Sequence, residues 1–254
     1  MISGAIVELD RVDSTNLYAN RLLDKGEMND GTVIWALEQH AGRGQNENVW
    51  YSDPGKNLTF TVVLYPRILG ANQQFRLNKS ISLGVLDFIK ARLSMIPSGI
   101  PRPAASIKWP NDIYIGDRKV AGILIENRIM GPQLDTSIVG IGININQEYF
   151  LPEAKNAVSL IHFNRHEIDL KQALSAVCRS LETRYGQLFS DYGKRLDEDY
   201  CSGLLGYRSN RKFLVNSEPF DGQITGVDDL GHLLIKKPSG ETVVFNHKEI
   251  EYLF

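Results

Sequence analysis

The sequence predicts an α+β fold, in which a mixed sheet with helices is followed by a small all-β unit. Up to residue 207, apolar stretches of strand length alternate with amphipathic stretches of helical length, whereas only short strands separated by turns follow residue 208. The chain has 254 residues, 43% of them apolar, enough for a core without a disulfide or a metal. We therefore expect a large domain at residues 1–207 and a small β-barrel domain at residues 208–254.

The expected strands are apolar segments that end at turn residues or prolines. Pro66 ends one strand, and the Pro-Asn-Asp turn at residues 110–112 separates two others. The larger domain has strands at residues 5–9, 32–39, 57–66, 107–109, 113–115, 119–126 and 137–146, and the smaller one at 211–216, 220–227, 232–237, 242–246 and 250–254.

The expected helices carry apolar residues at every third or fourth position. The first covers residues 13–26, with Ser14 or Thr15 as its N-cap and Gly26 as its stop signal. Further helices cover residues 74–93, 166–193 and 193–204, and residues 147–165 are irregular.

Composition excludes several classes of protein. Cys178 and Cys201 are too few for a disulfide framework, and Cys178 falls on the apolar stripe of a helix, which predicts buried, inert thiols in a reducing compartment. The net charge of −2 argues against a surface with general affinity for nucleic acid. The first ten residues do not have the pattern of a signal peptide, and no segment has the length and apolarity of a membrane span. We expect a cytoplasmic protein that binds neither DNA nor a membrane.

The loop GRGQNENVW, residues 42–50, places Arg43 between two glycines. Glycine lets backbone N–H groups approach a ligand closely, and the arginine can reach a phosphate or a carboxylate. The loop is neither a Walker A loop nor a Rossmann turn, because it lacks the residues that define them. A flexible surface turn accounts for the same residues, so the loop alone does not establish a site.

A second group of polar residues surrounds the KWPND sequence. A hairpin between Lys108 and Lys119 would bring both ammonium groups to one site, where Asp112 adds a carboxylate for Mg²⁺ or for proton transfer. The alternative is that Lys119, at the start of an apolar strand, only extends its charge to solvent. Gly140 and Gly142 in a strand interior indicate close approach of a ligand or of another part of the chain.

Several motifs, read together, carry a family resemblance. In chain order they are DSTN, EQHAGRGQ, WYSDPGKNL, KWPNDIY, KVAGILIE and GIGININ, within residues 8–147. This set resembles the biotin protein ligases. The resemblance implies a catalytic domain like that of the class II aminoacyl-tRNA synthetases and an SH3-like C-terminal β-barrel. Many bacterial members begin with a DNA-binding helix-turn-helix domain; this chain begins at the strand before DSTN, so we expect the ligase-only form.

The resemblance also implies a reaction and its participants. Biotin and ATP, with Mg²⁺, would give biotinyl-5′-AMP and pyrophosphate, and a lysine of a biotin carboxyl carrier protein, a domain of a carboxylase, would then receive the biotin and release AMP. The enzyme would be a monomer or a homodimer, because an exposed edge strand of the central sheet can pair with a second copy or with the carrier.

The motifs carry site residues over to this chain. Lys119 and Arg43 match the cations beside the reacting carboxylate and phosphate, and Asp112 also matches a residue near Mg²⁺. The biotin-contacting set is Ser14, Thr15, Asn16, Gln39, Arg43, Gly44, Gln45, Lys119, Gly140 and Gly142. The set that lines the nucleotide is Trp50, Lys108, Asp112 and Asn144.

Two other functions are compatible with these motifs. A lipoate or octanoate transferase of the same broader fold uses a similar lysine with a different acyl pocket, although KWPND and GRG favour biotin. A sensor that binds biotin or an adenylate and dimerises would need no catalysis, although Lys119 and Arg43 are both present.

The glycine-rich loop departs from the family pattern. Many relatives have two further arginines and a further glycine here, whereas this chain has Gln45, Asn46, Glu47 and Asn48. Neutral donors and backbone N–H groups would hold the adenylate less tightly than arginines do. We also expect residues 43–50 and 147–157 to be poorly ordered without ligand, since loops that close over ligands are drawn from the mobile parts of a protein.

The substitution Gln45→Arg tests the effect of this departure. It restores one cation to the loop, so escape of biotinyl-5′-AMP from the enzyme should slow, by roughly 10-fold for one charge-assisted hydrogen bond. A chase of labelled intermediate with unlabelled biotin and ATP measures the escape rate. An unchanged rate would show that the loop's charge does not control retention.

Overall fold

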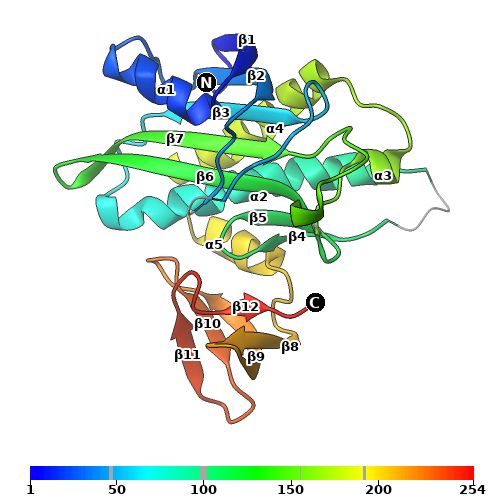
Figure 1. Ribbon diagram of the computed structural model, residues 1–254. Helices are drawn as coiled ribbons and strands as arrows, with labels where there is room; N and C mark the ends of the chain where they lie inside the picture. Colours follow the sequence, from blue (N-terminus) through cyan, green and yellow to red (C-terminus); the bar gives the residue numbers. More distant parts are fainter. Residues whose placement is uncertain (46–47, 98–101, 155, 191–192) are drawn as a thin grey trace.

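The structure, a computed structural model, describes residues 1–45, 48–97, 102–154, 156–190 and 193–254, and consists of two sheets and the helices between and around them (Figure 1). The strands are β1 Ile6–Val12, β2 Val33–Gln39, β3 Leu58–Leu64, β4 Ala105–Lys108, β5 Asp112–Ile115, β6 Arg118–Met130, β7 Gln133–Ile143, β8 Asn210–Val215, β9 Glu218–Val227, β10 Leu233–Lys236, β11 Thr242–Phe245 and β12 Glu251–Tyr252. The helices are α1 Thr15–Asp24, α2 Gln74–Ser94, α3 Ile161–Asn164, α4 Leu170–Gly186 and α5 Gly193–Gly203, with 3₁₀ turns at Ala71–Gln73, Pro152–Ala154 and Gln187–Phe189.

The larger sheet is mixed, as the sequence predicts. Its strand order is β1-β2-β3-β7-β6-β5-β4. Strands β1 and β2 are parallel and are joined through α1, whereas the other neighbours pair in antiparallel register. The long β6–β7 hairpin lies at the centre of the sheet, with β3 beside β7 and β5 beside β6.

The main hydrophobic core lies on one face of this sheet. Alternate residues of β3, Leu58, Phe60 and Val62, are fully buried there, because successive side chains of a strand point to opposite faces. Helices α2 and α4 cover this face and supply most of the remaining core (Figure 1). Cys178 of α4 is buried in this core as expected, and burial raises the pKa of its thiol to about 12.

The opposite face of the sheet is only partly covered. Helix α1 packs there on a small second core that contains Ile34, Val63 and Ile138. Beyond α1 the residues that face this side are small or polar, among them Thr59, Thr61 and the glycines of β6 and β7. This uncovered area is where the candidate site forms.

The C-terminal unit is an antiparallel sheet of order β11-β10-β9-β8-β12, as the pattern of short strands predicts. It follows α5 and packs beside the larger sheet at the KWPND turn, where the Trp109 indole N–H donates to the Gly231 carbonyl at 3.0 Å. The ring of His247 contacts the Trp109 ring edge-on, with centroids 5.8 Å apart. The C-terminal sheet therefore borders the uncovered face.

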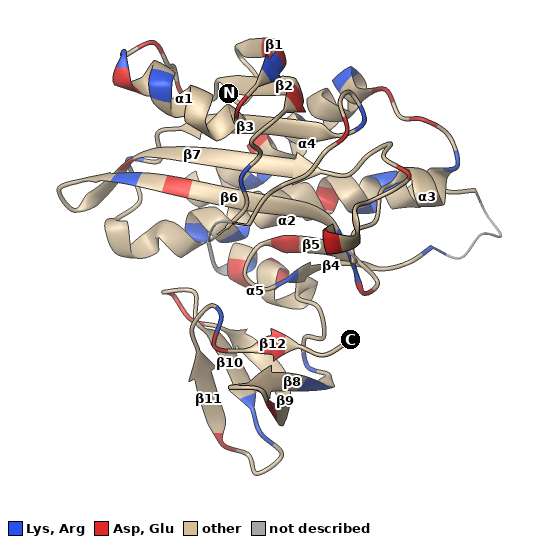
Figure 2. Ribbon diagram, viewed as in Figure 1, with Lys and Arg blue, Asp and Glu red and all other residues tan. Residues whose placement is uncertain are grey.

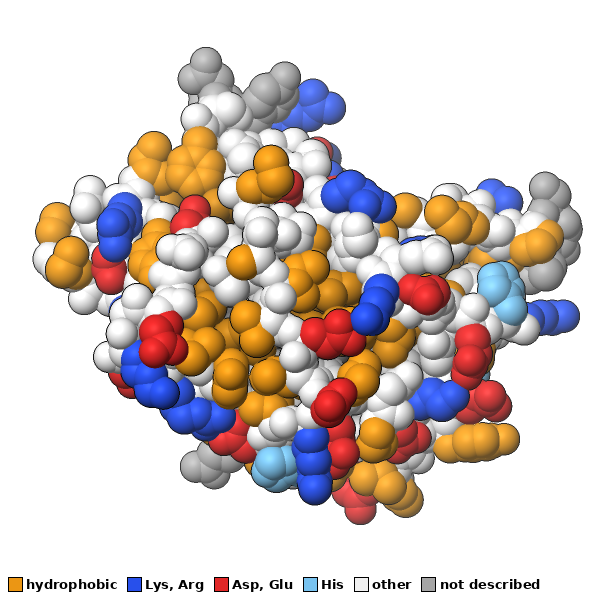
Figure 3. Space-filling model, turned by 90° about the horizontal axis from the view of Figure 1, so that it is seen from above, with side chains coloured by type: hydrophobic (Ala, Val, Ile, Leu, Met, Phe, Trp, Pro, Cys, Tyr) orange, Lys and Arg blue, Asp and Glu red, His pale blue; other side chains and the backbone are white. Residues whose placement is uncertain are grey.

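The surface mixes both signs of charge over both units (Figure 2). On the face seen in Figure 3, hydrophobic side chains lie between interleaved acidic and basic ones. Within the described residues, none of the helices combines the length and the apolarity that crossing a membrane requires.

Ser14 is the N-cap residue of α1, as the sequence predicts, although its side chain makes no capping hydrogen bond. Other sequence-based boundaries were wrong. The long third helix begins at Leu170 rather than at residue 166, because the Asp169 carboxylate caps it by accepting from the Gln172 N–H at 2.8 Å. It ends at Gly186, and residues 161–164 of the segment expected to be irregular form a short helix.

The contact between α2 and α4 yields a stability prediction. A methyl group at Gly84 would lie 2.9 Å from the Leu181 Cα, and neither backbone can move aside easily. Gly84→Ala should therefore destabilise the protein by about 1–3 kcal/mol. Gly186→Ala is the matched control: its methyl meets nothing within 4 Å and φ is −58°, so it should be neutral or stabilise by up to about 1 kcal/mol. Equal effects of the two substitutions in urea unfolding would refute the packing argument.

Candidate active site

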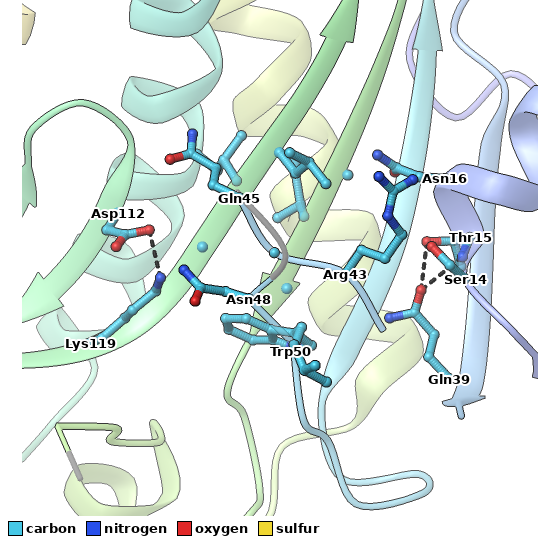
Figure 4. A pocket seen from close by; sticks show the side chains of 18 of the residues that line it. Ser14, Thr15, Asn16, Gln39, Arg43, Gln45, Asn48, Trp50, Asp112 and Lys119 are labelled. Atoms are coloured by element: carbon cyan, nitrogen blue, oxygen red, sulfur yellow. Dashed lines mark hydrogen bonds and ion pairs between the residues drawn. The ribbon is translucent and has the colours of Figure 1, made fainter. Parts of the chain in front are cut away.

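A cavity of about 300 Å³ opens on the uncovered face of the larger sheet. It collects every residue that the motifs single out except Asn144 (Figure 4). Its lining is Ser14, Thr15, Asn16, Gln39, Arg43, Gly44, Gln45, Asn48, Val49, Trp50, Phe60, Lys108, Asp112, Lys119, Gly122, Ile123, Leu124, Gly140, Ile141, Gly142, His247 and Lys248. Segments as far apart in the chain as Ser14 and Lys248 thus meet at one place.

Asn144 does not line this cavity. It is buried, its side-chain amide donates to the Val158 carbonyl at 3.2 Å, and its backbone N–H donates to the Val120 carbonyl. These bonds fix the end of β7 against β6 and against the segment that contains Val158. The structure therefore assigns Asn144 a supporting position rather than one in the cavity wall.

The start of α1 is held by β2 and not by its own cap residue. The Gln39 Oε1 atom accepts from the Thr15 N–H at 2.7 Å and from the Thr15 hydroxyl at 3.1 Å. One backbone donor at the helix N-terminus is thereby satisfied by a residue 24 positions away instead of by the side chain of the N-cap residue Ser14. Asp13 binds Arg21 and the Ser14 N–H, and these contacts, Arg21 first, lower the pKa of its carboxyl to about 2.

A chain of hydrogen bonds continues from this helix start across the sheet. The Thr61 hydroxyl lies 2.8 Å from Thr15 Oγ1 and 2.7 Å from Asn16 Oδ1, and can donate to either. The Asn16 amide N–H then donates to Glu126 Oε2 at 2.7 Å. The polar side chains at this end of the cavity are therefore fixed in orientation before any ligand arrives.

The glycines of β6 and β7 give these side chains room. A methyl group at Gly140 would collide with the Asn16 amide, and one at Gly142 would collide with the Trp50 ring. Gly122 lies against both the Trp50 ring and the Lys119 side chain. The expected close approach is thus made, in this structure, by side chains from α1 and from the glycine-rich loop.

The opposite end of the cavity is cationic. Lys119 Nζ lies 2.7 Å from Asp112 Oδ1, and its stem runs beside the Trp50 ring. Lys108 and Asp112 face each other across the β4–β5 turn, so the KWPND turn does bring Lys108 and Lys119 together. Burial lowers the pKa of the Lys108 ammonium, which lies 5.7 Å from the Tyr114 ring centre and 5.5 Å from that of Tyr252.

The glycine-rich loop folds back on itself over the sheet. The Gly44 N–H donates to the Asn48 carbonyl at 2.7 Å and the Trp50 N–H donates to the Gly42 carbonyl at 3.0 Å. These bonds bring Trp50 over β6 and β7, where its buried indole N–H has no acceptor among the described residues. Asn46 and Glu47 lie outside the described residues, and the expected disorder of this loop and of residues 147–157 stays a prediction.

Sequence reasoning missed the contribution of the C-terminal sheet to the cavity. His247 and Lys248 both line it, and burial lowers the pKa of His247. Lys248 has φ +77°, a left-handed backbone conformation that is unfavourable for residues other than glycine, asparagine and aspartate. No local sequence signal identifies either residue, because their position depends on how the two units pack. Thr61 and Glu126 were also missed. Each lies in an ordinary strand of the larger sheet, and no local sequence signal marks it as part of the site.

The two ends of the cavity differ in chemistry. One end presents fixed, neutral hydrogen-bonding groups, and the other presents Lys108, Lys119 and Lys248 with Asp112 as the carboxylate in the lining. Arg43 stands between them (Figure 4). Such a cavity fits a ligand with a polar neutral head and a strongly anionic end.

Comparison with known proteins now identifies the family. The family model described as "Biotin/lipoate A/B protein ligase family" matches residues 8–144, which is more than half of the chain. The chain belongs to the biotin/lipoate A/B protein ligase family. The matched residues contain all the members of the cavity lining except His247 and Lys248.

Individual relatives of this family agree along nearly the whole chain. The bifunctional ligase/repressor BirA of Bacillus subtilis is 31% identical over 93% of this chain and 71% of its own length. The biotin–[acetyl-CoA-carboxylase] ligase of Paracoccus denitrificans is 28% identical over 93% of this chain and 96% of its own. The structure of the biotin protein ligase of Aquifex aeolicus in complex with biotin and ATP superposes with a TM-score of 0.78 at 26% identity, over 98% of this chain and 100% of that one.

Proposed function

We propose that this chain is a biotin protein ligase, which activates biotin with ATP and transfers it to a lysine of a carrier protein. The observation that carries the proposal is the continuity of the neutral hydrogen-bonding end and the cationic end within one cavity. The relatives reported above are ligases for biotin, and the Aquifex aeolicus structure holds biotin and ATP.

In the first half-reaction, a biotin carboxylate oxygen attacks the α-phosphorus of ATP, and the bond from that phosphorus to the pyrophosphate oxygen breaks. Thr15, Asn16 and Gln39 would hold the ureido ring through their fixed donors and acceptors, and Arg43 and Lys119 would neutralise the carboxylate and the α-phosphate. Two anions must approach each other, so fixed cations between them lower the barrier.

In the second half-reaction, a lysine amine of the acceptor attacks the carbonyl carbon of the mixed anhydride. The bond from that carbon to the phosphate oxygen breaks, AMP leaves, and the amine loses a proton. The acceptor class we propose is a biotin carboxyl carrier domain, and the edge strands β1 and β4 are the surfaces of the larger sheet that could pair with it or with a second copy.

Mg²⁺ is a further part of the proposal. Within the described residues, no group of three His, Cys, Asp or Glu side chains could hold a metal by itself. Mg²⁺ commonly binds through one or two carboxylates together with substrate phosphates, and Asp112, beside Lys119 and Lys108, fits that mode. When bound, the ion would supply charge neutralisation at the phosphates, and Asp112 would exchange its contact with Lys119 for the metal.

The family also contains lipoate ligases, and one feature of the cavity favours biotin over lipoate. The dithiolane ring of lipoate offers no strong hydrogen-bond donor or acceptor, whereas the biotin ureido group offers two donors and one acceptor. The end of the cavity formed by Thr15, Asn16 and Gln39 is polar and hydrogen-bonded. A dithiolane would leave the remaining donors and acceptors of these groups without a partner, which costs about 1–3 kcal/mol for each group left unpaired.

Biotin-dependent exchange of labelled pyrophosphate into ATP tests the adenylation step. Wild-type protein should catalyse exchange that requires biotin and that excess lipoate does not inhibit. Lys119→Ala should reduce exchange by roughly 100-fold or more, because it removes a cation from the charge that develops at phosphorus. Tight biotin binding without any exchange would instead support the sensor, and competition by lipoate would support the acyl transferase.

The cavity lining from the C-terminal sheet gives a second test. Lys248→Gly removes a cation that we place beside the outer phosphates of ATP, so the KM for ATP should rise about 3- to 10-fold with biotin binding unchanged. It also relieves the left-handed strain, so Tm should rise by about 2 °C.

Ser217→Gly is the matched control for this substitution. Ser217 has φ +66° in the turn between β8 and β9 of the same unit and does not line the cavity, so the substitution should raise Tm similarly and leave the KM for ATP unchanged. If Lys248→Gly behaves in the same way as the control, the C-terminal sheet has no part in nucleotide binding.

A further inference from the structure

Glu126 is a carboxylate of β6 at the rim of the cavity, and it contacts two lining residues that come from different segments. Its Oε2 atom accepts from the Asn16 amide at 2.7 Å, and its Oε1 atom lies 3.4 Å from Arg43 Nη1. Glu126 is not itself among the lining residues. It therefore acts on a ligand through its two partners.

The two contacts differ in strength. The contact with Asn16 is short and continues the hydrogen-bond chain through Thr61 to Thr15 and Gln39, so it is part of a fixed network. The contact with Arg43 is long, and both side chains are partly exposed, at 46% for Arg43 and 32% for Glu126. An exposed pair of this kind contributes little and exchanges easily for another anion.

Arg43 must make such an exchange if it is to bind a ligand. Its guanidinium is held on the Asn16 side of the cavity by Glu126, whereas the proposed reaction requires it at the biotin carboxylate and the α-phosphate. The carboxylate of the ligand and that of Glu126 thus compete for one guanidinium. The contact with Asn16 does not compete, because that amide bonds to the other oxygen of Glu126.

From this geometry, and resting on the proposed function, we infer that Glu126 is a positioning residue that makes binding at this site depend on the charge of the ligand's acid group. With no anion in the cavity, Glu126 holds Arg43 and with it the start of the glycine-rich loop. A ligand carboxylate or phosphate displaces Glu126 from its ion pair with Arg43. The hydrogen bond between Glu126 and Asn16 remains, so Asn16 stays oriented for the neutral ring. A ligand with no acid group leaves Arg43 where it is.

Glu126→Gln separates the two contacts. Glutamine keeps an oxygen that can accept from the Asn16 amide, and it removes the negative charge that holds Arg43. The variant should bind biotin about 2- to 5-fold more tightly than wild type, since Arg43 no longer has to leave an ion pair. Its affinity for biotinamide, in which a neutral amide replaces the carboxylate, should stay as in wild type. Titration calorimetry with the full chain measures both affinities.

Two controls separate this role from simpler ones. Glu38→Gln removes the acid of another partly exposed ion pair, Arg11–Glu38 at 3.0 Å on the β1–β2 edge, and should change neither affinity. In an Arg43→Met background, Glu126→Gln should have no effect on biotin. If biotin still binds more tightly in that background, Glu126 only repels the ligand directly, and the inference is wrong.

The remaining outcomes distinguish this inference from the proposed function. Equal changes for biotin and biotinamide, or no change for either, would show that Glu126 supports Asn16 alone and would overturn the inference while leaving the ligase assignment intact. If the wild type binds neither biotin nor biotinamide, the proposed function is wrong, and the inference is wrong with it.

Discussion

The site depends on a difference in side-chain size and packing between the two faces of the larger sheet. On the covered face, β3, β6 and β7 carry large apolar side chains that pack under α2 and α4. On the other face the same strands carry Gly122, Gly140, Gly142 and Thr61, so the backbone surface is hollowed and polar. A sheet packed on both faces would be more stable by the burial of further apolar area. The protein gives up that stabilisation to keep a ligand-sized cavity.

Orientation in the cavity comes from hydrogen bonds between elements that are distant in sequence. Gln39 of β2 holds Thr15 of α1, and Glu126 of β6 holds Asn16. Each bond restrains a side chain of the neutral end through a partner on a rigid strand, so little rotational freedom remains to be lost when a ligand binds. The cationic end is arranged differently, because Lys119 and Arg43 both rest on carboxylates, Asp112 and Glu126.

This arrangement of carboxylates explains how a cavity rich in cations is compatible with folding. Lys119 and Arg43 unpaired in a partly enclosed site would repel each other and Lys108. Paired with Asp112 and Glu126, their charges are balanced in the absence of ligand, and the anions of the substrates can replace those carboxylates. Lys108 has no such ion pair among the described residues, and burial lowers the pKa of its ammonium.

The sequence by itself determined the α+β class, the mixed sheet followed by an antiparallel one, and 13 of the 20 cavity-lining residues between Ser14 and Gly142. It did so because strand and helix periods are local, and because the family's motifs cover those residues. Only the tertiary structure decided that Gln39 rather than Ser14 secures the start of α1, that Asn144 supports β7 outside the cavity, and that His247 and Lys248 reach the site from the second sheet. Glu126 belongs with these, since a glutamate at the end of an apolar strand looks like a solvated charge until its partners are known. The physical reason is the same in each case: these roles arise from hydrogen bonds and packing between residues far apart in the chain, and no local pattern encodes them.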